Sequence, residues 1–367
     1  MTTNRPAKVL HVETGPHLYG GALQVFYLLG GLQKAGWQNI LVCTKGSDIA
    51  RAAHGVVDRV YEAPMSGDLD VAFVSRLRRI IKEERPDLVH LHSRRGADLL
   101  GGIAARLSSV PVILTRRVDN PEPKWWVALK YRLYDQIVTI SEGIRAVLVS
   151  EGVPAHRIEC VHSAVDIERY KPNCDLQWFR NEFGLSEENK AVGMIAQLIL
   201  RKGHRYVFEA IPAICETHPE TRFLLFGKGP LEQELKEQCQ RHGLEKYVQF
   251  VGFRDDLDRV LPCLNVVAHP ADMEGLGVSL LQASACGVPI VATPAGGIPE
   301  IVRDGENGYL VPKADVNGIA DRLAQLLSDE ALAARMGQAG REIVEQNFSV
   351  KAMVDGNIRV YQGLLGH

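Results

Sequence analysis

The chain has 367 residues, which suits two domains of roughly 170 residues each better than a single core. With 46% hydrophobic and 23% charged residues it has the composition of an ordinary globular protein, and no apolar run reaches the ~20 residues of a membrane span. The net charge of −2 gives no support for a nucleic-acid partner, but residues 76–132 hold 13 basic and 6 acidic side chains. This basic patch could attract an anionic molecule or membrane surface; solvated helix faces with a few ion pairs explain it equally well.

The seven cysteines are spread along the chain without a CxxC pair: Cys43, Cys160, Cys174, Cys215, Cys239, Cys263 and Cys286. This spacing favours unpaired thiols in a reducing cytoplasm over a disulfide framework or a zinc site. The first residues run directly into an apolar strand, without the pattern of a signal peptide. We therefore expect a cytoplasmic protein that is able to associate with the inner face of the cytoplasmic membrane.

Strand-like apolar runs alternate with amphipathic runs of helix length along the chain. The first half contains such strands at residues 9–14, 39–44, 87–92, 110–115, 136–141 and 157–163. The second half contains them at residues 191–196, 222–227, 248–252, 265–270, 289–293 and 308–312. This alternation predicts an α/β protein with two doubly wound, Rossmann-like parallel sheets.

A polar break at residues 166–177, which includes Pro172, is the best candidate for a linker. We expect an N-terminal domain at 1–170, a second domain at 171–348, and a C-terminal helix at 349–367 that could cross back to the first domain. Ligands bind at the carboxyl ends of parallel strands. The cleft between two such domains is therefore the expected active site.

The first strand is followed by Gly20 and Gly21, directly before a helix. Backbone N–H groups there could approach a phosphate closely, and a tight turn without a ligand is an equal alternative. The stretch lacks the GxGxxG pattern, and no convincing acid ends the second strand. Both observations argue against a nicotinamide cofactor.

In the second half, Arg201, Lys202 and Gly203 lie between a strand and a helix, where Lys202 could neutralise a diphosphate leaving group. A simple helix start is the alternative interpretation. Glycines also end the next two strands, at Gly227 and Gly252, and would let backbone groups read the edge of a base. Turn geometry explains these glycines equally well.

The most informative stretch is EGLGVSLLQASACGVPIVATPAGG, residues 274–297. Glu274 precedes a glycine-rich turn, and a helix opens near Val278 and Ser279, so that its N-terminal amides form an anion site. Glu274 beside that site can accept hydrogen bonds from sugar hydroxyls. A carboxylate that merely favours the helix N-terminus is the second-ranked interpretation. Gln282 lies two turns further along the helix, near the same face.

Other polar and aromatic residues indicate a binding surface in the first half. His92, Arg94 and Arg95 follow a strand; His92 could bind or help to deprotonate a hydroxyl group, and a structural role is equally compatible. Trp125 and Trp126 lie among Lys124, Lys130 and Arg132. Such a group suits a membrane interface or a sugar-stacking platform, and core packing of the two tryptophans is at least as compatible.

Taken together, these motifs resemble the retaining glycosyltransferase family 4, which has the GT-B fold. The resemblance covers nearly the whole chain. Its most specific part is EGLGVSLLQASACGVPIVATPAGGIPEIVRDGENGYLV at 274–311, and DLVHLHS, QIVTIS, DIERYKP, LRKG and FGKGP support it.

The resemblance implies a nucleotide-sugar donor, usually linked to UDP or GDP, transfer with retention of anomeric configuration, and no metal or other cofactor. It implies catalytic roles for Glu274 and Lys202, and we add His92 from its place after a strand. The predicted donor-binding residues, from the resemblance and from the strand ends together, are Gly20, Gly21, Gln197, Arg201, Lys202, Gly227, Gly252, Phe253, Glu274, Gly275, Leu276, Gly277, Val278, Ser279 and Gln282. The expected acceptor-binding residues are His92, Arg94, Arg95, Arg116, Arg117, Trp125 and Trp126.

Three positions depart from the family pattern: Gln197 replaces an Arg, Gln282 an acid, and Arg117 a His. None of these changes removes a group that must exchange a proton, and Arg201 or Arg116 could restore the lost cation. We expect a working transferase that uses a UDP-sugar or, as a second choice, a GDP-sugar. The acceptor would be a glycan, lipid-linked or phosphorylated, in lipopolysaccharide or cell-surface polysaccharide biosynthesis. A catalytically impaired nucleotide-sugar-binding protein and a nucleotide-sugar 2-epimerase are the alternatives.

Overall fold

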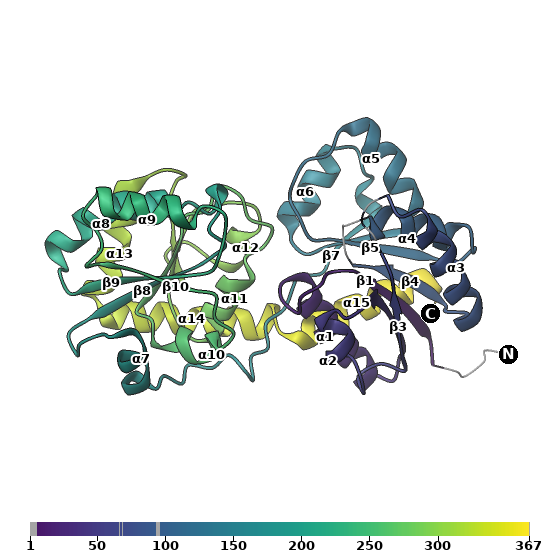
Figure 1. Ribbon diagram of the computed structural model, residues 1–367, viewed down its shortest axis with the longest axis horizontal. Helices are drawn as coiled ribbons and strands as arrows, with labels where there is room; N and C mark the ends of the chain where they lie inside the picture. The colour runs from purple at the N-terminus through teal and green to yellow at the C-terminus, as the bar shows by residue number, and fades with distance from the viewer. Residues whose placement is uncertain (1–5, 66, 68, 93–95, 367) are drawn as a thin grey trace. The chain divides into compact units, whose positions relative to one another are not determined.

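The computed structural model describes residues 6–65, 67, 69–92 and 96–366. Two compact units make up the chain (Figure 1). Unit 1 combines the residues up to Ala164 with those from Val350 onward, and unit 2 spans Val165–Ser349. Each unit has a parallel sheet covered by helices on both faces, which confirms the predicted fold class.

Unit 1 contains a seven-stranded sheet in the order β3-β2-β1-β4-β5-β6-β7. Its strands are β1 (Lys8–Glu13), β2 (Gln38–Thr44), β3 (Arg59–Ala63), β4 (Leu88–Leu91), β5 (Val112–Arg116), β6 (Gln136–Thr139) and β7 (Ile158–Cys160). Its helices are α1 (Gly21–Lys34), α2 (Asp48–Ala52), α3 (Ala72–Glu84), α4 (Ala97–Arg106), α5 (Lys124–Lys130), α6 (Glu142–Ser150) and α15 (Val350–Leu365), with 3₁₀ turns η1 (Tyr131–Leu133) and η2 (Ala155–Arg157).

The two faces of the unit 1 sheet have different covers. Alternate strand positions such as Leu10 pack in one cluster with Phe73 of α3. The intervening positions, such as Val9, pack in another cluster with Leu28 of α1 and Tyr361 of α15. Successive side chains of a strand point to opposite faces of the sheet. His11 and Glu13 therefore lie on the same face as Val9, the face covered by α1 and α15.

Strand β3 was not predicted from the sequence. Its five residues, RVYEA, pair with β2 at the edge of the sheet and include Arg59, Tyr61 and Glu62. Only Ala63 is fully buried. An edge strand needs few apolar residues, so this segment lacks the continuous apolar run that identifies the central strands.

Unit 2 contains a six-stranded sheet in the order β10-β9-β8-β11-β12-β13. Its strands are β8 (Lys190–Ile195), β9 (Thr221–Phe226), β10 (Val248–Gly252), β11 (Val266–His269), β12 (Ile290–Ala292) and β13 (Gly308–Leu310). Its helices are α7 (Leu176–Phe183), α8 (His204–Thr217), α9 (Glu232–Arg241), α10 (Leu257–Val260), α11 (Val278–Ala285), α12 (Ile298–Ile301), α13 (Val316–Ser328) and α14 (Glu330–Asn347), with 3₁₀ turns η3 (Leu200–Lys202) and η4 (Leu261–Cys263).

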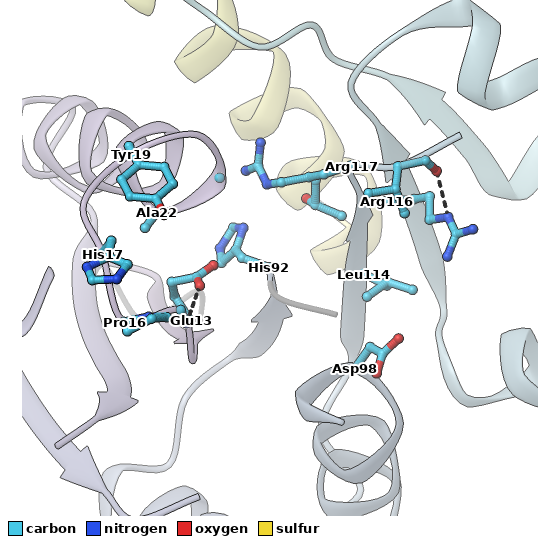
Figure 2. Close-up of a pocket in the computed structure, with 14 residues that line it drawn as sticks. Glu13, Pro16, His17, Tyr19, Ala22, His92, Asp98, Leu114, Arg116 and Arg117 are labelled. Carbon is cyan, nitrogen blue, oxygen red and sulfur yellow. Dashed lines mark hydrogen bonds between the residues drawn. The ribbon is translucent and has the colours of Figure 1, made fainter. Parts of the chain in front are cut away.

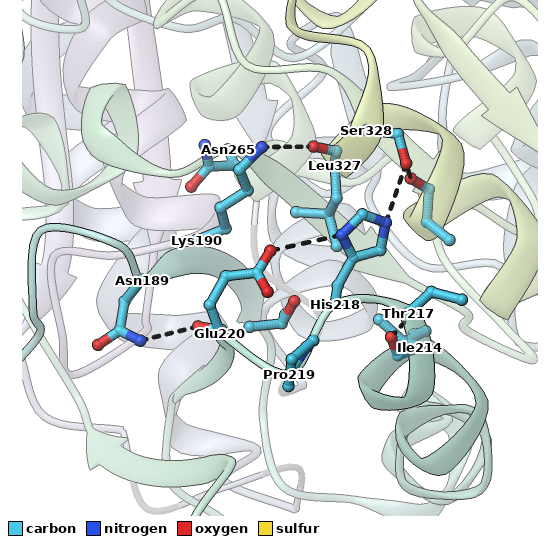
Figure 3. Close-up of polar contacts among 12 residues, drawn as sticks. Asn189, Lys190, Ile214, Thr217, His218, Pro219, Glu220, Asn265, Leu327 and Ser328 are labelled. Atoms are coloured by element: carbon cyan, nitrogen blue, oxygen red, sulfur yellow. Dashed lines mark hydrogen bonds and ion pairs between the residues drawn. The ribbon is translucent and has the colours of Figure 1, made fainter.

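Polar contacts hold the amino-terminal edge of the unit 2 sheet together (Figure 3). His218, which follows α8, approaches Ser328 Oγ of α13 to 2.9 Å with its Nε2 atom and Glu220 Oε1 to 3.4 Å with its Nδ1 atom. Lys190 Nζ at the start of β8 donates to the carbonyl oxygen of Leu327 at 2.6 Å. These contacts fix α8 and α13 at the edge opposite the strand ends where ligands bind.

The unit boundaries differ slightly from those expected at 170/171 and 348/349. The chain enters unit 2 at Val165, whose N–H donates to the carbonyl oxygen of Phe348 at 2.9 Å, and leaves it after Ser349. Arg341 of α14 donates to the carbonyl oxygens of Ile167 and Tyr170. These contacts attach residues 165–170 to unit 2. The C-terminal helix α15 belongs to unit 1, where it packs beside α1.

One disulfide corrects the expectation that all cysteines are unpaired. Cys174, before α7, bonds to Cys263 of η4 across 89 residues of sequence, with the two Cα atoms 4.9 Å apart. The spacing rule failed because the partners are distant in sequence and only the fold brings them together. Unpaired thiols would have supported a reducing compartment. With this disulfide present, the cysteines no longer support that prediction.

Within the described part of the chain, no helix combines the length and apolar character needed to cross a membrane.

Candidate functional site

Glu274 in unit 2 lies in the loop between β11 and α11. Its Oε2 atom is 2.5 Å from Lys202 Nζ and 2.9 Å from His269 Nε2, and its Oε1 atom accepts the Gly275 N–H at 3.1 Å. Lys202 reaches it from η3, the loop that follows β8, because β8 and β11 are neighbours in the sheet. The two residues singled out in the sequence thus form a direct ion pair.

The charge of Glu274 is set by its neighbours. Burial alone would raise the pKa of this carboxyl, but the hydrogen bond and charge of His269 and the charge of Lys202 outweigh it and lower the pKa from 4.5 to about 2. Glu274 is therefore an ionised hydrogen-bond acceptor at neutral pH. The Lys202 side chain, 11% exposed, keeps its cation where an incoming phosphate would compete with this carboxylate.

Helix α11 presents its N-terminus next to this ion pair. It begins at Val278 after Gly277, whose φ of 100° lies in the left-handed region that favours glycine. The Leu280 N–H donates to the Gly277 carbonyl oxygen at 2.9 Å, and the earlier N–H groups of Val278 and Ser279 have no intrahelical acceptor, so an anion is stabilised there. A Cβ atom at Gly203 would lie 1.9 Å from the carbonyl oxygen of Pro270, so this glycine allows the loops after β8 and β11 to meet.

Further predicted donor residues lie on the same edge of the unit 2 sheet, whereas Gly20 and Gly21 belong to unit 1. The N–H of Gly227 donates to the carbonyl oxygen of Gly252 at 2.8 Å, which joins the loops after β9 and β10. Phe253 follows with 57% of its surface exposed. Gln197 is exposed after β8, and Arg201 is half-buried in η3.

Gln282 has a structural contact that the sequence did not reveal. Its Nε2 atom donates to the Tyr170 hydroxyl at 2.8 Å. Arg341 donates to the Tyr170 carbonyl oxygen at 2.6 Å and to that of Ala285, at the end of α11, at 2.5 Å. Gln282 therefore ties α11 to the segment by which the chain enters unit 2.

Unit 1 has a pocket of about 610 Å³ at the carboxyl ends of β1, β4 and β5 (Figure 2). Its lining combines carboxylates, cations and rings with the glycine loop that precedes α1. It includes Glu13, His17, Tyr19, Gly21, His92, Asp98, Arg116 and Arg117. Gly20 immediately precedes α1 with a φ of 54°.

His92 is one of the predicted residues in this pocket. The side chain is 3% exposed, and its Nε2 atom lies 3.0 Å from Nδ1 of His11. Burial, followed by the charges of His90, His11 and Arg117, places the pKa of His92 well below its usual value. The imidazole is therefore neutral at neutral pH. His90 lies within β4 and points to Thr115 and Tyr361 rather than lining the pocket.

Arg116 and Arg117 were both predicted to bind the acceptor, and the structure separates them. The Arg116 guanidinium donates to the carbonyl oxygens of Val118 and Asn120 and forms an ion pair with Glu122 at 3.3 Å. It therefore orders the loop after β5. Figure 2 shows the Arg117 guanidinium turned the other way, toward the glycine loop.

Arg117 packs against Gly21, where a Cβ atom would lie 3.1 Å from Arg117 Cδ. Burial lowers the pKa of Arg117 to about 10, and the charge of Glu13 opposes this effect. Burial likewise raises the pKa of Glu13, while the Gly15 N–H at 2.7 Å and the charge of Arg117 lower it. The pocket thus holds a buried acid and a partly buried cation.

The two predicted tryptophans differ in exposure. Trp125 is 72% exposed and Trp126 is half-buried, so packing of both in the core is wrong. Neither belongs to the pocket lining. Arg94 and Arg95 lie outside the described residues.

Three buried histidines, His11, His90 and His92, bring ring nitrogens within 4.8 Å of one another, close enough to consider a metal ion. Hydrogen-bond partners within the protein already occupy both nitrogens of His11 and of His90. Asn39 and Thr115 are among these partners. The cluster is therefore accounted for as a hydrogen-bond network.

Two family profiles match the chain: "Glycosyltransferase Family 4" over residues 19–169 and "Glycosyl transferases group 1" over residues 177–343. The chain is 26% identical over 321 residues to N-acetyl-alpha-D-glucosaminyl L-malate synthase of Bacillus anthracis, covering 85% of this chain and 84% of that protein. It is 29% identical over 299 residues to the GDP-mannose-dependent alpha-(1-6)-phosphatidylinositol monomannoside mannosyltransferase of Mycolicibacterium smegmatis, covering 75% and 76%.

The chain belongs to glycosyltransferase family 4. Its fold is the GT-B fold: Anabaena Alr3699/HepE, solved in complex with UDP and glucose, matches it with a TM-score of 0.83 at 21% identity, covering 97% of this chain and 99% of that one.

Glu13, His11 and His269 of the candidate site were not predicted from the sequence. His11 and Glu13 are two residues apart on β1. His90 in β4 and His92 just after β4 have the same spacing, so all four side chains lie on the sheet face covered by α1 and α15. A polar residue at every second position near a strand's carboxyl end is a readable signal. His269 ends the apolar strand β11 and carried no comparable signal.

Proposed function

We propose that this protein is a retaining, metal-independent glycosyltransferase that moves a sugar from a nucleotide-sugar donor, with a UDP-sugar favoured over a GDP-sugar. The observation that carries this proposal is the Lys202–Glu274–His269 cluster beside the N-terminus of α11. A cation, an ionised carboxylate and unpaired helix amides are the groups that a sugar diphosphate needs.

In the ligand-free site, Lys202 is neutralised by Glu274. A bound diphosphate offers Lys202 a stronger anion, and the helix amides share the charge that develops as the sugar departs. Glu274 then accepts hydrogen bonds from the sugar hydroxyls, while His269 keeps its carboxylate in place. No step requires a protein group to form a covalent bond with the sugar.

Unit 1 supplies the acceptor site in this proposal. Arg117 and Glu13 lie on opposite sides of the same pocket, so it can hold a molecule with both an anionic group and hydroxyls. The names of the two relatives above refer to an N-acetylglucosaminyl L-malate and to a phosphatidylinositol monomannoside, both of them anionic compounds. We therefore favour a phosphorylated or lipid-linked glycan, as in lipopolysaccharide or cell-surface polysaccharide biosynthesis.

The first test is a thermal-shift panel of UDP, GDP, UDP-glucose, UDP-N-acetylglucosamine and GDP-mannose. A ligand at 100 times its dissociation constant stabilises a protein by about 2.7 kcal/mol. One nucleotide sugar should shift the melting temperature, and Lys202→Met should cut the stabilisation to about half or less, because a tenfold weaker site is filled to only about 10 times its dissociation constant. The exposed Lys246→Met, in the turn before β10, is the control for loss of charge. Absence of any shift would contradict the proposal.

Incubation of the bound nucleotide sugar alone separates the alternatives. Slow release of free sugar supports a transferase, because water then replaces the acceptor. Conversion to a second nucleotide sugar would favour the 2-epimerase. Binding without any turnover, with or without acceptor lipids, would favour the impaired binding protein.

We also propose that unit 1 contacts an anionic phospholipid surface. Trp125 and Leu129, 72% and 58% exposed, lie one turn apart on α5, and Arg132 is exposed in the following turn. Arg106 donates to the Arg132 carbonyl oxygen at 3.3 Å, which joins this strip to the exposed Leu107. Exposed aromatic and aliphatic side chains with flanking cations suit the interface of a membrane.

Sedimentation with vesicles tests this surface. The wild type should bind vesicles that contain phosphatidylglycerol more tightly than vesicles of phosphatidylcholine alone, and added salt should weaken the binding. Trp125→Ser with Leu129→Ser should reduce binding without lowering the melting temperature. Leu176→Ser, at an exposed apolar residue of unit 2, is the matched control. Equal binding by the double variant would refute the assignment.

A further inference from the structure

A chain of three buried side chains crosses the unit 1 sheet and ends in the pocket. Asn39 of β2 is 0% exposed, as is His11 of β1, and His92 after β4 is 3% exposed. Asn39 Oδ1 lies 3.3 Å from His11 Nε2, and His11 Nδ1 lies 3.0 Å from His92 Nε2. The planes of the His11 and His92 rings are nearly parallel, with an interplanar angle of 10°.

The orientation of the Asn39 amide is fixed by a second contact. Its Nδ2 atom donates to the carbonyl oxygen of Trp37 at 3.2 Å. A carbonyl oxygen accepts only, so the amide nitrogen must face Trp37 and the amide oxygen must face His11. The side of Asn39 that meets His11 is therefore an acceptor.

This acceptor determines where the protons of both histidines lie. His11 must carry its proton on Nε2 to donate to Asn39, and burial lowers the pKa of His11 to about 3, so the ring holds only one proton. Its Nδ1 is then an acceptor, and His92 must donate to it from Nε2. His92 is neutral as well, which leaves the Nδ1 atom of His92 as a bare lone pair.

The Nδ1 atom of His92 is buried and has no hydrogen-bond partner among the described residues, while the side chain lines the pocket. We propose that Asn39 and His11 are positioning residues that hold His92 in its Nε2-protonated tautomer, so that its Nδ1 atom accepts a hydrogen bond from the attacking hydroxyl of the acceptor. This inference rests on the proposed function and names a group that orients the nucleophile.

His92 orients the hydroxyl rather than keeping its proton. An imidazolium at this buried position would lie close to Arg117, whose charge disfavours it. The hydroxyl oxygen forms its bond to the anomeric carbon as the bond from that carbon to the diphosphate oxygen breaks. The single hydroxyl proton, which points at His92 Nδ1 before the reaction, turns to the departing diphosphate oxygen and leaves on it. The hydrogen bond to His92 directs an oxygen lone pair at the anomeric carbon.

The wild-type protein allows a direct test that needs no substrate. Long-range ¹H–¹⁵N spectra of protein labelled at histidine distinguish a protonated from a bare ring nitrogen. We expect the Nε2-protonated form at both His11 and His92, with assignments from the His11→Asn and His92→Asn variants. A proton on Nδ1 of His92 would overturn the inference.

Asn39→Asp should reverse the direction of the hydrogen bond between His11 and His92. A carboxylate beside Nε2 favours a doubly protonated His11, which then donates from Nδ1 to His92 and moves the His92 proton to its Nδ1 atom. The kcat for hydrolysis of the nucleotide sugar identified by the panel should fall about tenfold, the worth of one neutral hydrogen bond. The KM for that donor should stay within about twofold, because the donor is bound by unit 2.

Tyr361→Phe is the matched control. It removes the 2.6 Å contact between the Tyr361 hydroxyl and His90 Nδ1 on the same sheet face, outside the chain that leads to His92. The control should leave the His92 tautomer and kcat unchanged. A fall in kcat equal to that of Asn39→Asp would mean that any loss of a buried hydrogen bond here matters, and would overturn the assignment.

The two proposals fail in different ways. If no nucleotide sugar binds, the proposed function fails, and the tautomer measured by NMR is unaffected. If a donor binds and is turned over while His92 carries its proton on Nδ1, only the positioning role is overturned.

Discussion

Replacing Glu274 by Gln should destabilise unit 2 by an amount that the structure allows us to work out. The pKa of Glu274 is lowered from 4.5 to about 2, which corresponds to about 3 kcal/mol of stability at pH 7. The side chains of Glu274 and Lys202 are 15% and 11% exposed, so solvent screens this pair only weakly. Breaking a buried ion pair from one side has a cost of the same order, about 3–5 kcal/mol.

The stabilisation should disappear in acid. Because the pKa of Glu274 is lower in the folded state, its contribution is complete above the unfolded pKa of 4.5 and is lost as the pH falls toward 2. The difference between wild type and Glu274→Gln should decrease from about 3 kcal/mol at pH 7 to about 1.4 kcal/mol at pH 3. A carboxylate exposed to solvent has the same pKa in the folded and unfolded states, so its replacement would give no pH-dependent difference in stability.

Differential scanning calorimetry of both proteins from pH 7 to pH 3 checks this prediction. For a unit of this size, about 3 kcal/mol lowers the melting temperature by roughly 6–12 °C. Glu232→Gln is the control, because it breaks an exposed ion pair with Lys236 on α9. It should change the melting temperature by no more than about 2 °C. Equal melting temperatures for wild type and Glu274→Gln at pH 7, or a difference that persists undiminished at pH 3, would refute the reasoning.

Three further predictions concern other charged or cross-linked positions. Glu13→Gln should raise the melting temperature of unit 1 at pH 7, because burial raises the pKa of Glu13 and its ionised form costs stability; calorimetry should show this gain vanish in acid. Replacing Cys174 and Cys263 by Ser should lower the free energy of unfolding by about 4 kcal/mol, since the bond closes an 89-residue loop; urea titrations with and without dithiothreitol measure this. Lys202→Met should weaken binding of the selected nucleotide sugar at least tenfold in calorimetric titration, and unchanged affinity would exclude Lys202 from the site.

The sheets could be predicted from the sequence because central parallel strands are buried on both faces. The runs at residues 40–43 and 266–268 are apolar at every position, and the structure places strands in both. The edge strand β3 is covered less completely and was missed. The disulfide was missed as well, because its two cysteines meet only after unit 2 has folded around η4.

The site was predictable where a loop carried its own signal. Glu274 and Lys202 each follow a strand and adjoin glycines, and the parallel order β8-β11 brings them into contact. The neighbours that tune them were hidden, because His269 belongs to an apolar strand and its hydrogen bond depends on the turn of the next five residues. The sequence alone could not distinguish Arg116 from Arg117. In the structure their side chains point in opposite directions: Arg116 orders the loop after β5, and Arg117 packs against Gly21 at the pocket.

Gln282, where the family pattern has an acid, makes a packing contact in addition to its predicted role at the donor site. Its amide nitrogen donates to the Tyr170 hydroxyl at 2.8 Å. A carboxylate there has no proton to give, so the Tyr170 hydroxyl would have to become the donor. Since Tyr170 belongs to the segment by which the chain enters unit 2, an amide at 282 joins α11 to that segment and still keeps an oxygen that can accept from a hydroxyl. The exchange of acid for amide therefore alters a charge without removing an acceptor, which is compatible with a donor site that still works.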